Sequence, residues 1–424
     1  MDPVSRKLSR ELVADLIAKN EPDVEIISLD EEPGSKRGDN YTSMLYRLRV
    51  NGRKRLKINE WIPWDTSLIY KVLPESKARR DAYKSELLFR NEVAFYNRVW
   101  PALNELQKKK KVFNGIVKVY MAKSNLIIME DLKRKGYVMA DRRKGLELNR
   151  LKLVLKALAG FHALSLALRE LRSEVFKQLT DENNNENATE GLFRSENEDW
   201  YRNYYRVAAK NAIVMVSEAL PADQEQKRNN ILEKLESFLH EDVFFRSMCE
   251  LASSQGPFTV FCHGDCWTNN FLFSNDSETH SEKVYLVDFQ LIRVGSLALD
   301  LVNFLYCCTT GEIRQLHMTS LLLHYHSHLM EALQILNPHK SRDPLATWEL
   351  LNEEIRRCGR FGFGMALDIL PLSTCDSDNA PDLYETASGN SEETQKLRAP
   401  SPGGAECARL MTDVVLELIQ NRAL

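Results

Sequence analysis

Residues 262–270 read CHGDCWTNN, and residues 284–290 read VYLVDFQ, so that each apolar stretch ends in polar side chains. Asp265 is followed five residues later by Asn270, and Asp288 stands at the end of the second apolar stretch. Phosphoryl transfer requires a base that orients the attacking hydroxyl group and metal ions that neutralise the phosphate oxygens. Mg²⁺ takes oxygen ligands such as carboxylates. The pattern therefore predicts phosphoryl transfer, with Asp265 as catalytic base and with Asn270 and Asp288 as Mg²⁺ ligands.

Each of these residues alone has a structural explanation, because Asp and Asn are common in turns. Their combination at this spacing is more specific. Three other polar residues are interpreted as structural rather than reacting groups. We expect His263 to brace the loop, Asp300 to tether it or cap the following helix, and His162 to be a hydrogen-bonded core histidine.

The partners for ATP are predicted upstream, in residues 67–74 (SLIYKVLP) and in the helical stretch around Glu92. Lys71 lies in an apolar strand, where burying its charge is costly unless an anion is near. ATP phosphate and the Glu92 carboxylate would both serve. The alternatives are an edge-strand lysine whose ammonium reaches water and a solvent-facing glutamate.

Two further segments are predicted to bind the nucleotide. Residues 125–132 (NLIIMEDL) are an apolar strand that ends in acids, as expected of a hinge whose backbone groups at Glu130 and Leu132 contact adenine. Residues 38–43 (GDNYTS) form a turn whose backbone amides, including that of Asn40, are expected over the phosphates, although a GxGxxG motif is absent.

Periodicity divides the chain into a sheet-rich part and a helical part. By analogy with the known layout of kinases, we expect a bilobal α+β, protein-kinase-like fold. We assign residues 1–132 to a β-rich N-terminal lobe that ends in the hinge, and residues 133–424 to a larger, mostly helical C-terminal lobe. The first lobe is expected to contain one inner helix, Ala82–Val99, and a hairpin at Asn51-Gly52. The polar stretch Thr180–Asp199 is predicted to be a mobile loop, and residues 375–406 are predicted to be flexible.

The 424 residues carry a net charge of −3 and are 43% hydrophobic, which does not suggest nucleic-acid binding. The eight cysteines include no CxxC pair, so neither a zinc site nor a disulfide framework is indicated, and a reducing compartment is the simplest interpretation. The N-terminus is charged throughout, unlike a signal peptide, and no apolar window reaches the length of a membrane span. We therefore expect a cytoplasmic protein without a membrane partner.

Residues 262–273 (CHGDCWTNNFLF) and 285–305 (YLVDFQLIRVGSLALDLVNFL) resemble the insect ecdysteroid kinase-like family, which is related to choline kinases and aminoglycoside phosphotransferases. Further blocks resemble it in the same order between Gly38 and Leu372, among them residues 88–103, 135–148, 158–165 and 359–372. The resemblance implies a bilobal kinase that uses ATP and Mg²⁺ on a small hydroxylated acceptor, an ecdysteroid, a similar sterol or a xenobiotic in detoxification. It also implies the roles given above for Lys71, Glu92, Asp265, Asn270 and Asp288.

Three other function classes are weighed against a small-molecule kinase. A protein kinase is disfavoured because arginine is missing from the His-x-Asp motif and glutamine follows Asp288-Phe289. A catalytically weak or inactive kinase-like binding protein would not need the base Asp265. A metal-dependent hydrolase would require more His and carboxylate ligands. The acceptor pocket is expected in the helical lobe, with aromatic side chains that are also explicable as core: Trp200, Tyr201, Trp267 and Phe361. The oligomeric state is not indicated.

Overall fold

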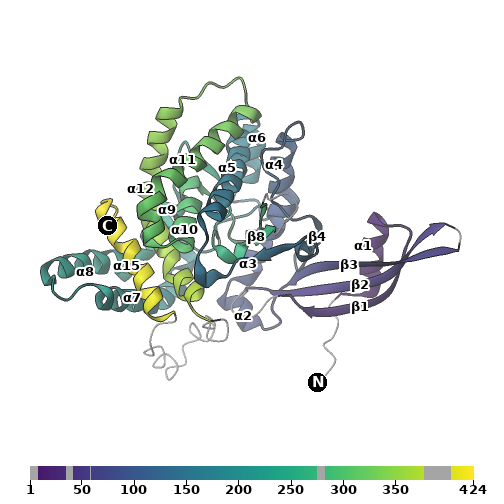
Figure 1. The fold of residues 1–424 in the computed structure, drawn as a ribbon, viewed down its shortest axis with the longest axis horizontal. Helices are drawn as coiled ribbons and strands as arrows, with labels where there is room; N and C mark the ends of the chain where they lie inside the picture. Colours follow the sequence, from purple (N-terminus) through teal and green to yellow (C-terminus); the bar gives the residue numbers. More distant parts are fainter. Residues whose placement is uncertain (1–7, 35–41, 58, 275–281, 377–402) are drawn as a thin grey trace.

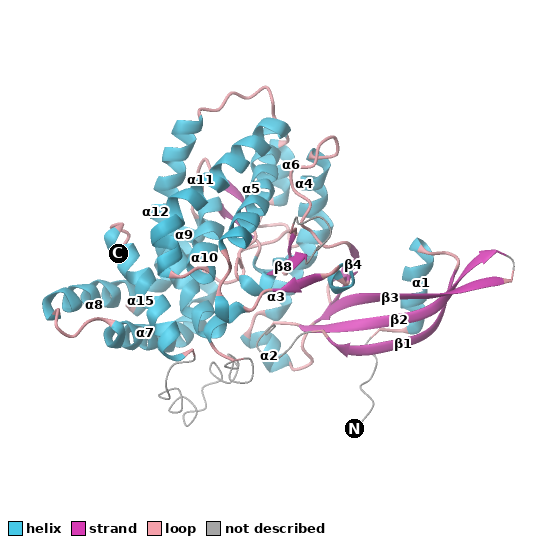
Figure 2. Ribbon diagram, viewed as in Figure 1, coloured by secondary structure: helices cyan, strands magenta, loops and turns pink. Residues whose placement is uncertain are grey.

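The computed structural model describes residues 8–34, 42–57, 59–274, 282–376 and 403–424. An antiparallel sheet and a short helix lie at one end of the molecule, and a larger group of helices forms the other end (Figure 1). Figure 2 shows that strands dominate the first region and helices the second. The predicted bilobal α+β fold, with a β-rich N-terminal lobe and a mostly helical C-terminal lobe, is confirmed.

The N-terminal sheet has five antiparallel strands in the order β1-β2-β3-β5-β4. The strands are β1 (Val24–Pro33), β2 (Met44–Lys57), β3 (Glu60–Val72), β4 (Val119–Lys123) and β5 (Leu126–Glu130). Helix α1 (Arg10–Asn20) is capped at its N-terminus by Ser9, whose side chain accepts a hydrogen bond from the Leu12 amide. Its buried residues Val13, Leu16 and Ile17 join a small core with the sheet.

The hairpin predicted at Asn51-Gly52 is wrong. Strand β2 continues through both residues to Lys57, and β3 begins at Glu60, directly after Asn59 with its φ of +66°. Gly52 is explained by the neighbouring strand, because a Cβ there would lie 2.4 Å from the Glu25 carbonyl oxygen. A glycine that signals a turn in the sequence is here required by a close approach of backbones.

The single helix predicted for residues 82–99 is divided. The observed elements are α2 (Lys77–Ala82), α3 (Ser85–Ala94), a π-helical turn (Phe95–Val99) and α4 (Trp100–Leu106). Lys84 interrupts the first two with φ +52°. The π-helical turn buries Phe95 in a stack on Phe289, with ring centroids 3.7 Å apart, so a break in regular helix lies beside the end of the Asp288 strand.

The C-terminal lobe surrounds a long buried helix, α5 (Leu148–Leu171), which packs against α11. The other helices are α6 (Ser173–Leu179), α7 (Glu198–Ala219), α8 (Glu225–Leu239), α9 (Glu241–Ser253), α10 (Leu297–Cys308), α11 (Gly311–Leu336), α12 (Pro344–Thr374) and α15 (Gly404–Gln420). Short antiparallel strands flank the loops that contain Asp265, Asn270 and Asp288: β6 (Tyr137–Met139), β7 (Thr259–Cys262), β8 (Phe271–Ser274), β9 (Val284–Leu286) and β10 (Arg293–Ser296).

Two predictions for this lobe need correction. Among the described residues, α5 is the one helix long and apolar enough to cross a membrane, although 78% of its most apolar window is buried inside the protein, as in a core helix. The stretch predicted as a mobile loop, Thr180–Asp199, instead has buried polar side chains at Asn187, Thr189 and Asn197. The Asn187 and Asn197 side chains donate to backbone carbonyl oxygens, and the Thr189 N–H donates to Asn91 Oδ1. These bonds fix a polar segment most of which has no regular secondary structure.

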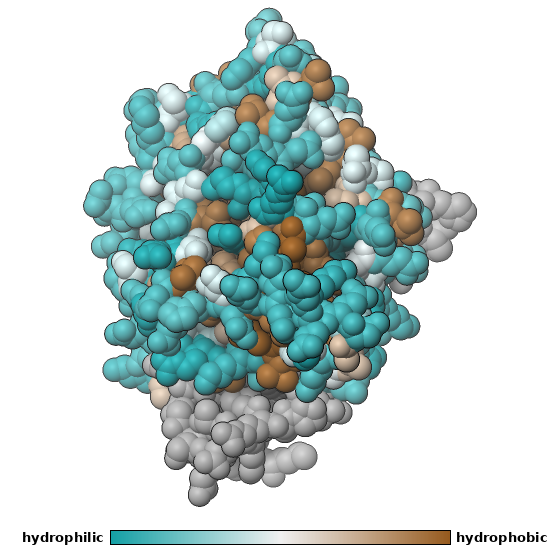
Figure 3. Space-filling view, turned by 90° about the vertical axis from the view of Figure 1, so that its left-hand side faces the viewer, coloured by the Kyte–Doolittle hydropathy of each residue, from teal (hydrophilic) through white to brown (hydrophobic). Residues whose placement is uncertain are grey.

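The surface at the end formed by the C-terminal helices is mainly hydrophilic, with apolar side chains in small groups (Figure 3). Such scattered apolar groups are normal on folded proteins. The lobe boundary predicted at residue 132 stays a prediction, since Leu132 begins a 3₁₀ turn that leads directly into β6. Most of residues 375–406 lie outside the described residues.

Candidate active site

The loop that follows β7 contains His263, Gly264 and Asp265, and its shape depends on Gly264. This residue has φ +86°, and a Cβ there would lie 1.8 Å from the Leu291 carbonyl oxygen. Only glycine adopts this conformation without a collision. The His-Gly-Asp sequence therefore has glycine at its centre because the next strand connection packs directly on it.

Asp300 holds the loop through hydrogen bonds to its backbone. Its Oδ2 accepts the His263 N–H at 2.6 Å and its Oδ1 accepts the Gly264 N–H at 2.9 Å. His162 Nε2 lies 3.1 Å from Oδ2, and its Nδ1 lies 2.8 Å from the Tyr325 hydroxyl. Burial raises the pKa of Asp300, but His162, His263 and the Gly264 amide more than offset this, so the carboxyl pKa is lowered. The predicted tether at Asp300 and the predicted core role of His162 are both confirmed.

His263 connects the loop to the second strand. Its Nε2 lies 3.0 Å from the Val287 carbonyl oxygen, and its Nδ1 accepts the Asp265 N–H at 3.2 Å. These partners fit a neutral ring with its proton on Nε2. Burial lowers the pKa of His263, which agrees with this form. The predicted bracing role is confirmed, and one side chain fixes both the Asp265 backbone and the residue before Asp288.

Asp265 and Asn270 contact each other directly. Asn270 Nδ2 donates to the Asp265 carbonyl oxygen at 2.9 Å and to its carboxylate Oδ2 at 2.8 Å. Burial, and then the charge of Asp288, raise the pKa of Asp265 to about 7. With its amide nitrogen turned to Asp265, Asn270 keeps its amide oxygen available for another ligand.

Lys71 joins the two lobes through carboxylates. Its Nζ lies 2.6 Å from Glu92 Oε2 on α3 and 2.7 Å from Asp288 Oδ1 in the C-terminal lobe. The Lys71 and Glu92 side chains are only 3% and 1% exposed, so neither alternative of a water-facing side chain holds. Burial lowers the pKa of Lys71, but the two carboxylates outweigh it and the net shift is upward, which keeps the ammonium charged.

Asp288 has the unusual backbone conformation φ +67°, ψ +68°. Left-handed non-glycine residues are uncommon, and Asp tolerates this region better than most. The conformation turns the chain sharply after Val287 and directs the carboxylate to Lys71. Strain of this kind is often found at functional sites.

A cleft of about 940 Å³ lies between the lobes, which is the size range of ligand pockets. Six of the predicted site residues line it: Lys71, Glu92, Glu130, Leu132, Asn270 and Asp288. Asp265 is joined to this wall through Asn270. Asn40 lies outside the described residues.

The predicted hinge is held by contacts within the protein. The Glu130 N–H donates to the Lys118 carbonyl oxygen at 2.9 Å, so this group is not available to a ligand. Contact of Glu130 or Leu132 with adenine stays a prediction. Sequence reasoning missed Arg47, which lines the cleft and pairs with Asp131 at 2.7 Å directly after β5. It also missed Asn269, whose buried amide nitrogen has no partner among the described residues.

Three of the four aromatic residues suggested for an acceptor pocket pack on other rings, and the fourth, Trp267, is buried. Trp200 stacks on Tyr204 and Tyr201 on Phe245, with centroids 5.3 and 5.2 Å apart. Phe361 contacts Phe193 edge to face at 5.5 Å. Their place in an acceptor pocket stays a prediction.

The donor set at the cleft fits Mg²⁺ bound together with a phosphate ligand. Asp288 and Asn270 offer one carboxylate and one amide oxygen, and Mg²⁺ is usually held by one or two carboxylates plus substrate phosphates. In the described part of the chain no three His, Cys, Asp or Glu side chains gather as a metal site. A complete protein-only cage is thus not what these residues provide.

Comparisons with known proteins agree with the predicted resemblance. A model of the ecdysteroid kinase-like family matches residues 37–338, more than two thirds of the chain. No curated protein matches. Among solved structures, a Plasmodium vivax ethanolamine kinase is 16% identical with a TM-score of 0.45, covering 97% of this chain and 88% of that chain. A choline kinase from Cryptosporidium parvum is 12% identical with a TM-score of 0.44, covering 98% of both chains.

Proposed function

We propose that this chain, which belongs to the ecdysteroid kinase-like family, is an ATP- and Mg²⁺-dependent kinase of small molecules. It would transfer the γ-phosphate to a hydroxyl group of an ecdysteroid, a similar sterol or a xenobiotic. The observation that carries the proposal is the convergence of Lys71, Glu92 and Asp288 across one cleft, beside the Asp265–Asn270 pair.

The proposed roles follow from these contacts. Asp265 would accept the hydroxyl proton, and its raised pKa of about 7 suits a general base near neutral pH. Asn270 orients the Asp265 carboxylate through its amide nitrogen and would offer its oxygen to a metal ion. Lys71, held by Glu92, would bind a phosphate oxygen, and Asp288 would be the carboxylate ligand of the metal. Mg²⁺, when bound, supplies positive charge against the phosphate oxygens.

The support for a reducing compartment is the state of the cysteines. All eight are free, and seven of them are buried. We propose a cytoplasmic location on this basis, since disulfides are rare in that compartment.

The test is transfer of labelled phosphate from Mg·ATP to a panel of ecdysteroids, choline, ethanolamine, aminoglycosides, plant phenolic glycosides and a generic protein. A labelled small molecule, formed by the unaltered protein only, supports the proposal. Asp265→Asn is expected to retain ATP binding and to reduce turnover roughly a hundredfold or more. Near-normal turnover in this variant would remove Asp265 from its role.

A second variant tests the metal site. Asp288→Ala is expected to abolish Mg²⁺-dependent ATP binding in calorimetry, because it removes the proposed carboxylate ligand. Unchanged affinity would contradict this role. A protein that binds Mg·ATP but transfers phosphate to no acceptor would favour the alternative, a catalytically weak or inactive kinase-like binding protein.

A further inference from the structure

We propose that the ion pair between Arg293 and Glu190 is a latch that holds residues 187–197 beside Asp265, where they form one wall of the acceptor site. Arg293 and Glu190 are thus positioning residues. The assignment of an acceptor rests on the proposed function, whereas the latch itself does not.

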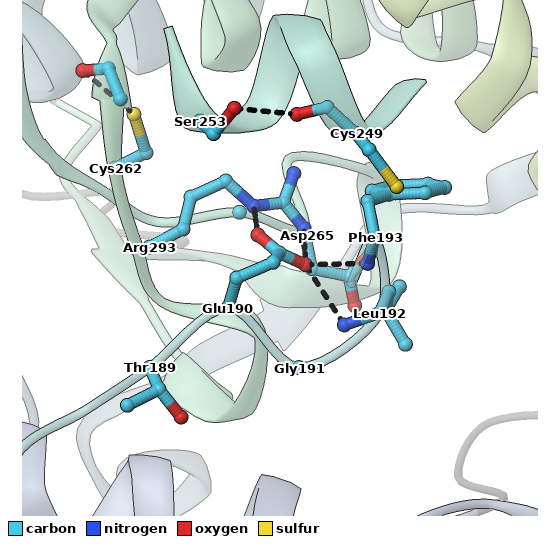
Figure 4. Close-up of polar contacts among 12 residues, drawn as sticks. Thr189, Glu190, Gly191, Leu192, Phe193, Cys249, Ser253, Cys262, Asp265 and Arg293 are labelled. Carbon is cyan, nitrogen blue, oxygen red and sulfur yellow. Dashed lines mark hydrogen bonds and ion pairs between the residues drawn. The ribbon is translucent and has the colours of Figure 1, made fainter. Parts of the chain in front are cut away.

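The position of Arg293 is fixed by the strand that leads into the loop. Arg293 begins β10, and its antiparallel partner across the ladder is Cys262, the residue before His263. Figure 4 shows the guanidinium group beside Asp265. Arg293 therefore reaches the Asp265 loop from the strand that pairs with β7.

The guanidinium group is almost completely buried. The Arg293 side chain is 1% exposed, and its Nε lies 2.7 Å from Glu190 Oε2. Its central carbon lies 5.1 Å from the Phe361 ring centroid and 5.6 Å from that of Phe193. An isolated charge in such surroundings is strongly unfavourable, so the Glu190 carboxylate is required wherever Arg293 keeps this position.

Glu190 also organises its own segment. Its Oε1 accepts the Leu192 N–H at 2.8 Å and the Phe193 N–H at 3.0 Å (Figure 4). Asn197 Nδ2 closes the segment by donating to the Gly191 and Leu192 carbonyl oxygens at 3.1 and 2.9 Å. One carboxylate therefore shapes the turn and attaches it to the strand that carries Arg293.

The same segment reaches the N-terminal lobe. Asn91, next to Glu92 on α3, donates through Nδ2 to the Thr189 carbonyl oxygen at 2.7 Å, and its Oδ1 accepts the Thr189 N–H at 3.1 Å. Gly191 fits against α3 so closely that a Cβ would lie 2.5 Å from Leu88. The segment thus links the helix that positions Glu92 to the base of the Asp265 loop.

The direction from which the acceptor must approach Asp265 is the reason for assigning this wall to the acceptor site. The attacking and leaving oxygens of phosphoryl transfer are roughly in line, so the acceptor must reach Asp265 from the side away from the nucleotide. Residues 187–197 and Arg293 do not line the interlobe cleft, but Gly191 and Gly264 both approach Leu291. The segment thus lies outside the cleft lining and meets the Asp265 loop at Leu291, and the proposal places the acceptor on this side.

A purely structural ion pair is the alternative, and the chain contains a matched example. Arg314 Nε lies 2.7 Å from Glu417 Oε2, with side chains 1% and 21% exposed, against 1% and 16% for the Arg293–Glu190 pair. Arg314 also lies over a ring, that of Tyr306. This second pair joins α11 to α15 and has no contact with the loop of Asp265 among the described residues.

The test compares Glu190→Gln with Glu417→Gln in the full chain by hydrogen–deuterium exchange and by kinetics. In Glu190→Gln, amides of residues 187–197 should exchange at least about tenfold faster, since weakening the pair by 1.4 kcal/mol is a tenfold change. The KM for the acceptor should rise or kcat should fall by a similar factor, with ATP affinity unchanged. Glu417→Gln should change none of these. Arg293→Lys, which keeps the charge, should lose less activity than Arg293→Met.

Equal exchange in residues 187–197 of both glutamine variants would overturn the latch. Faster exchange with unchanged acceptor KM and kcat would overturn the acceptor wall. If the unaltered protein transfers phosphate to no acceptor while binding Mg·ATP, the proposed function fails and the acceptor wall with it, whereas the exchange measurement still decides the latch.

Discussion

Replacing Asp300 by asparagine should loosen the loop of Asp265 without touching a ligand. The carboxylate accepts the His263 and Gly264 amides on different oxygens, Oδ2 at 2.6 Å and Oδ1 at 2.9 Å. The isosteric amide has one oxygen only, so one of the two buried N–H groups must face an NH₂ group whichever way the side chain is turned.

The cost can be worked from these two bonds. A hydrogen bond to a charged group contributes about 1.5–3 kcal/mol, and an unsatisfied buried donor costs about 1–3 kcal/mol. One lost bond and one weakened bond give a destabilisation of roughly 3 kcal/mol, a large part of the 5–15 kcal/mol that stabilises a typical fold. The expected result is a lower melting temperature together with a kcat reduced at least about tenfold, while ATP affinity is retained.

The pH dependence has a definite sign. The pKa of Asp300 is lowered in the folded protein. Its contribution to folding stability is therefore fully present above the unfolded pKa of 3.8 and is lost as the pH falls from that value through the folded pKa. The part of the difference in free energy of unfolding between Asp300→Asn and the unaltered protein that comes from the Asp300 charge should therefore be constant from pH 6 to pH 8. Thermal unfolding, calorimetry with Mg·ATP and steady-state kinetics measure the three effects.

Asp343→Asn is the matched control. Asp343 is an exposed N-cap whose Oδ1 accepts the Leu345 amide at 2.9 Å. Asparagine caps helices about as well as aspartate, so a change below about 0.5 kcal/mol is expected. If Asp300→Asn were no less stable and no slower than this control, the tether would have no part in holding the loop.

Two further predictions concern the backbone at Gly264 and the burial of Asp368. Gly264→Ala should give little folded protein, because its Cβ would lie 1.8 Å from the Leu291 carbonyl oxygen. Gly136→Ala, at φ +78° with no atom within 4 Å of its Cβ, should reduce the free energy of unfolding by only about 1 kcal/mol, and similar yields and melting temperatures of the two variants would contradict the reasoning. Burial raises the pKa of Asp368 from 3.8 to about 6, so the folded state binds its proton more tightly and the unaltered protein loses stability as pH rises between these values. The Asp368→Asn variant lacks this loss. Its free energy of unfolding, minus that of the unaltered protein, should therefore increase by up to about 3 kcal/mol between pH 4 and pH 7. Thermal unfolding measures this difference, and a value independent of pH would exclude a raised pKa at Asp368.

The part of the site that could be predicted from the sequence is the part where chemistry restricts residue type. Lys71 in an apolar strand requires an anion, and the structure gives it Glu92 and Asp288. Asp265 and Asn270 are five residues apart, and they meet because a single loop brings them together. The cost of burying charge was sufficient to predict the Lys71–Glu92 pair, whereas the contact of Lys71 with Asp288, 217 residues away, was not predicted.

Contacts over long sequence separations could not be predicted in this way. Arg293 and Glu190 are 103 residues apart, and Glu190 belongs to a segment whose composition is typical of a mobile loop. Its order comes from tertiary partners such as Asn91, which composition does not reveal. Gly52 was misinterpreted for the same reason, since the requirement for glycine comes from β1 and not from its own strand.

The geometry of the candidate site is thus held by buried polar groups that touch no ligand. Asp300 fixes the His263 and Gly264 amides, and His263 reaches across to the Val287 carbonyl oxygen. A movement of the Asp265 loop therefore breaks hydrogen bonds among buried groups, where an unpaired donor or acceptor is costly. Because this support comes from α10 and from the residue that follows β9, the reacting groups can be held closely although they lie in a loop.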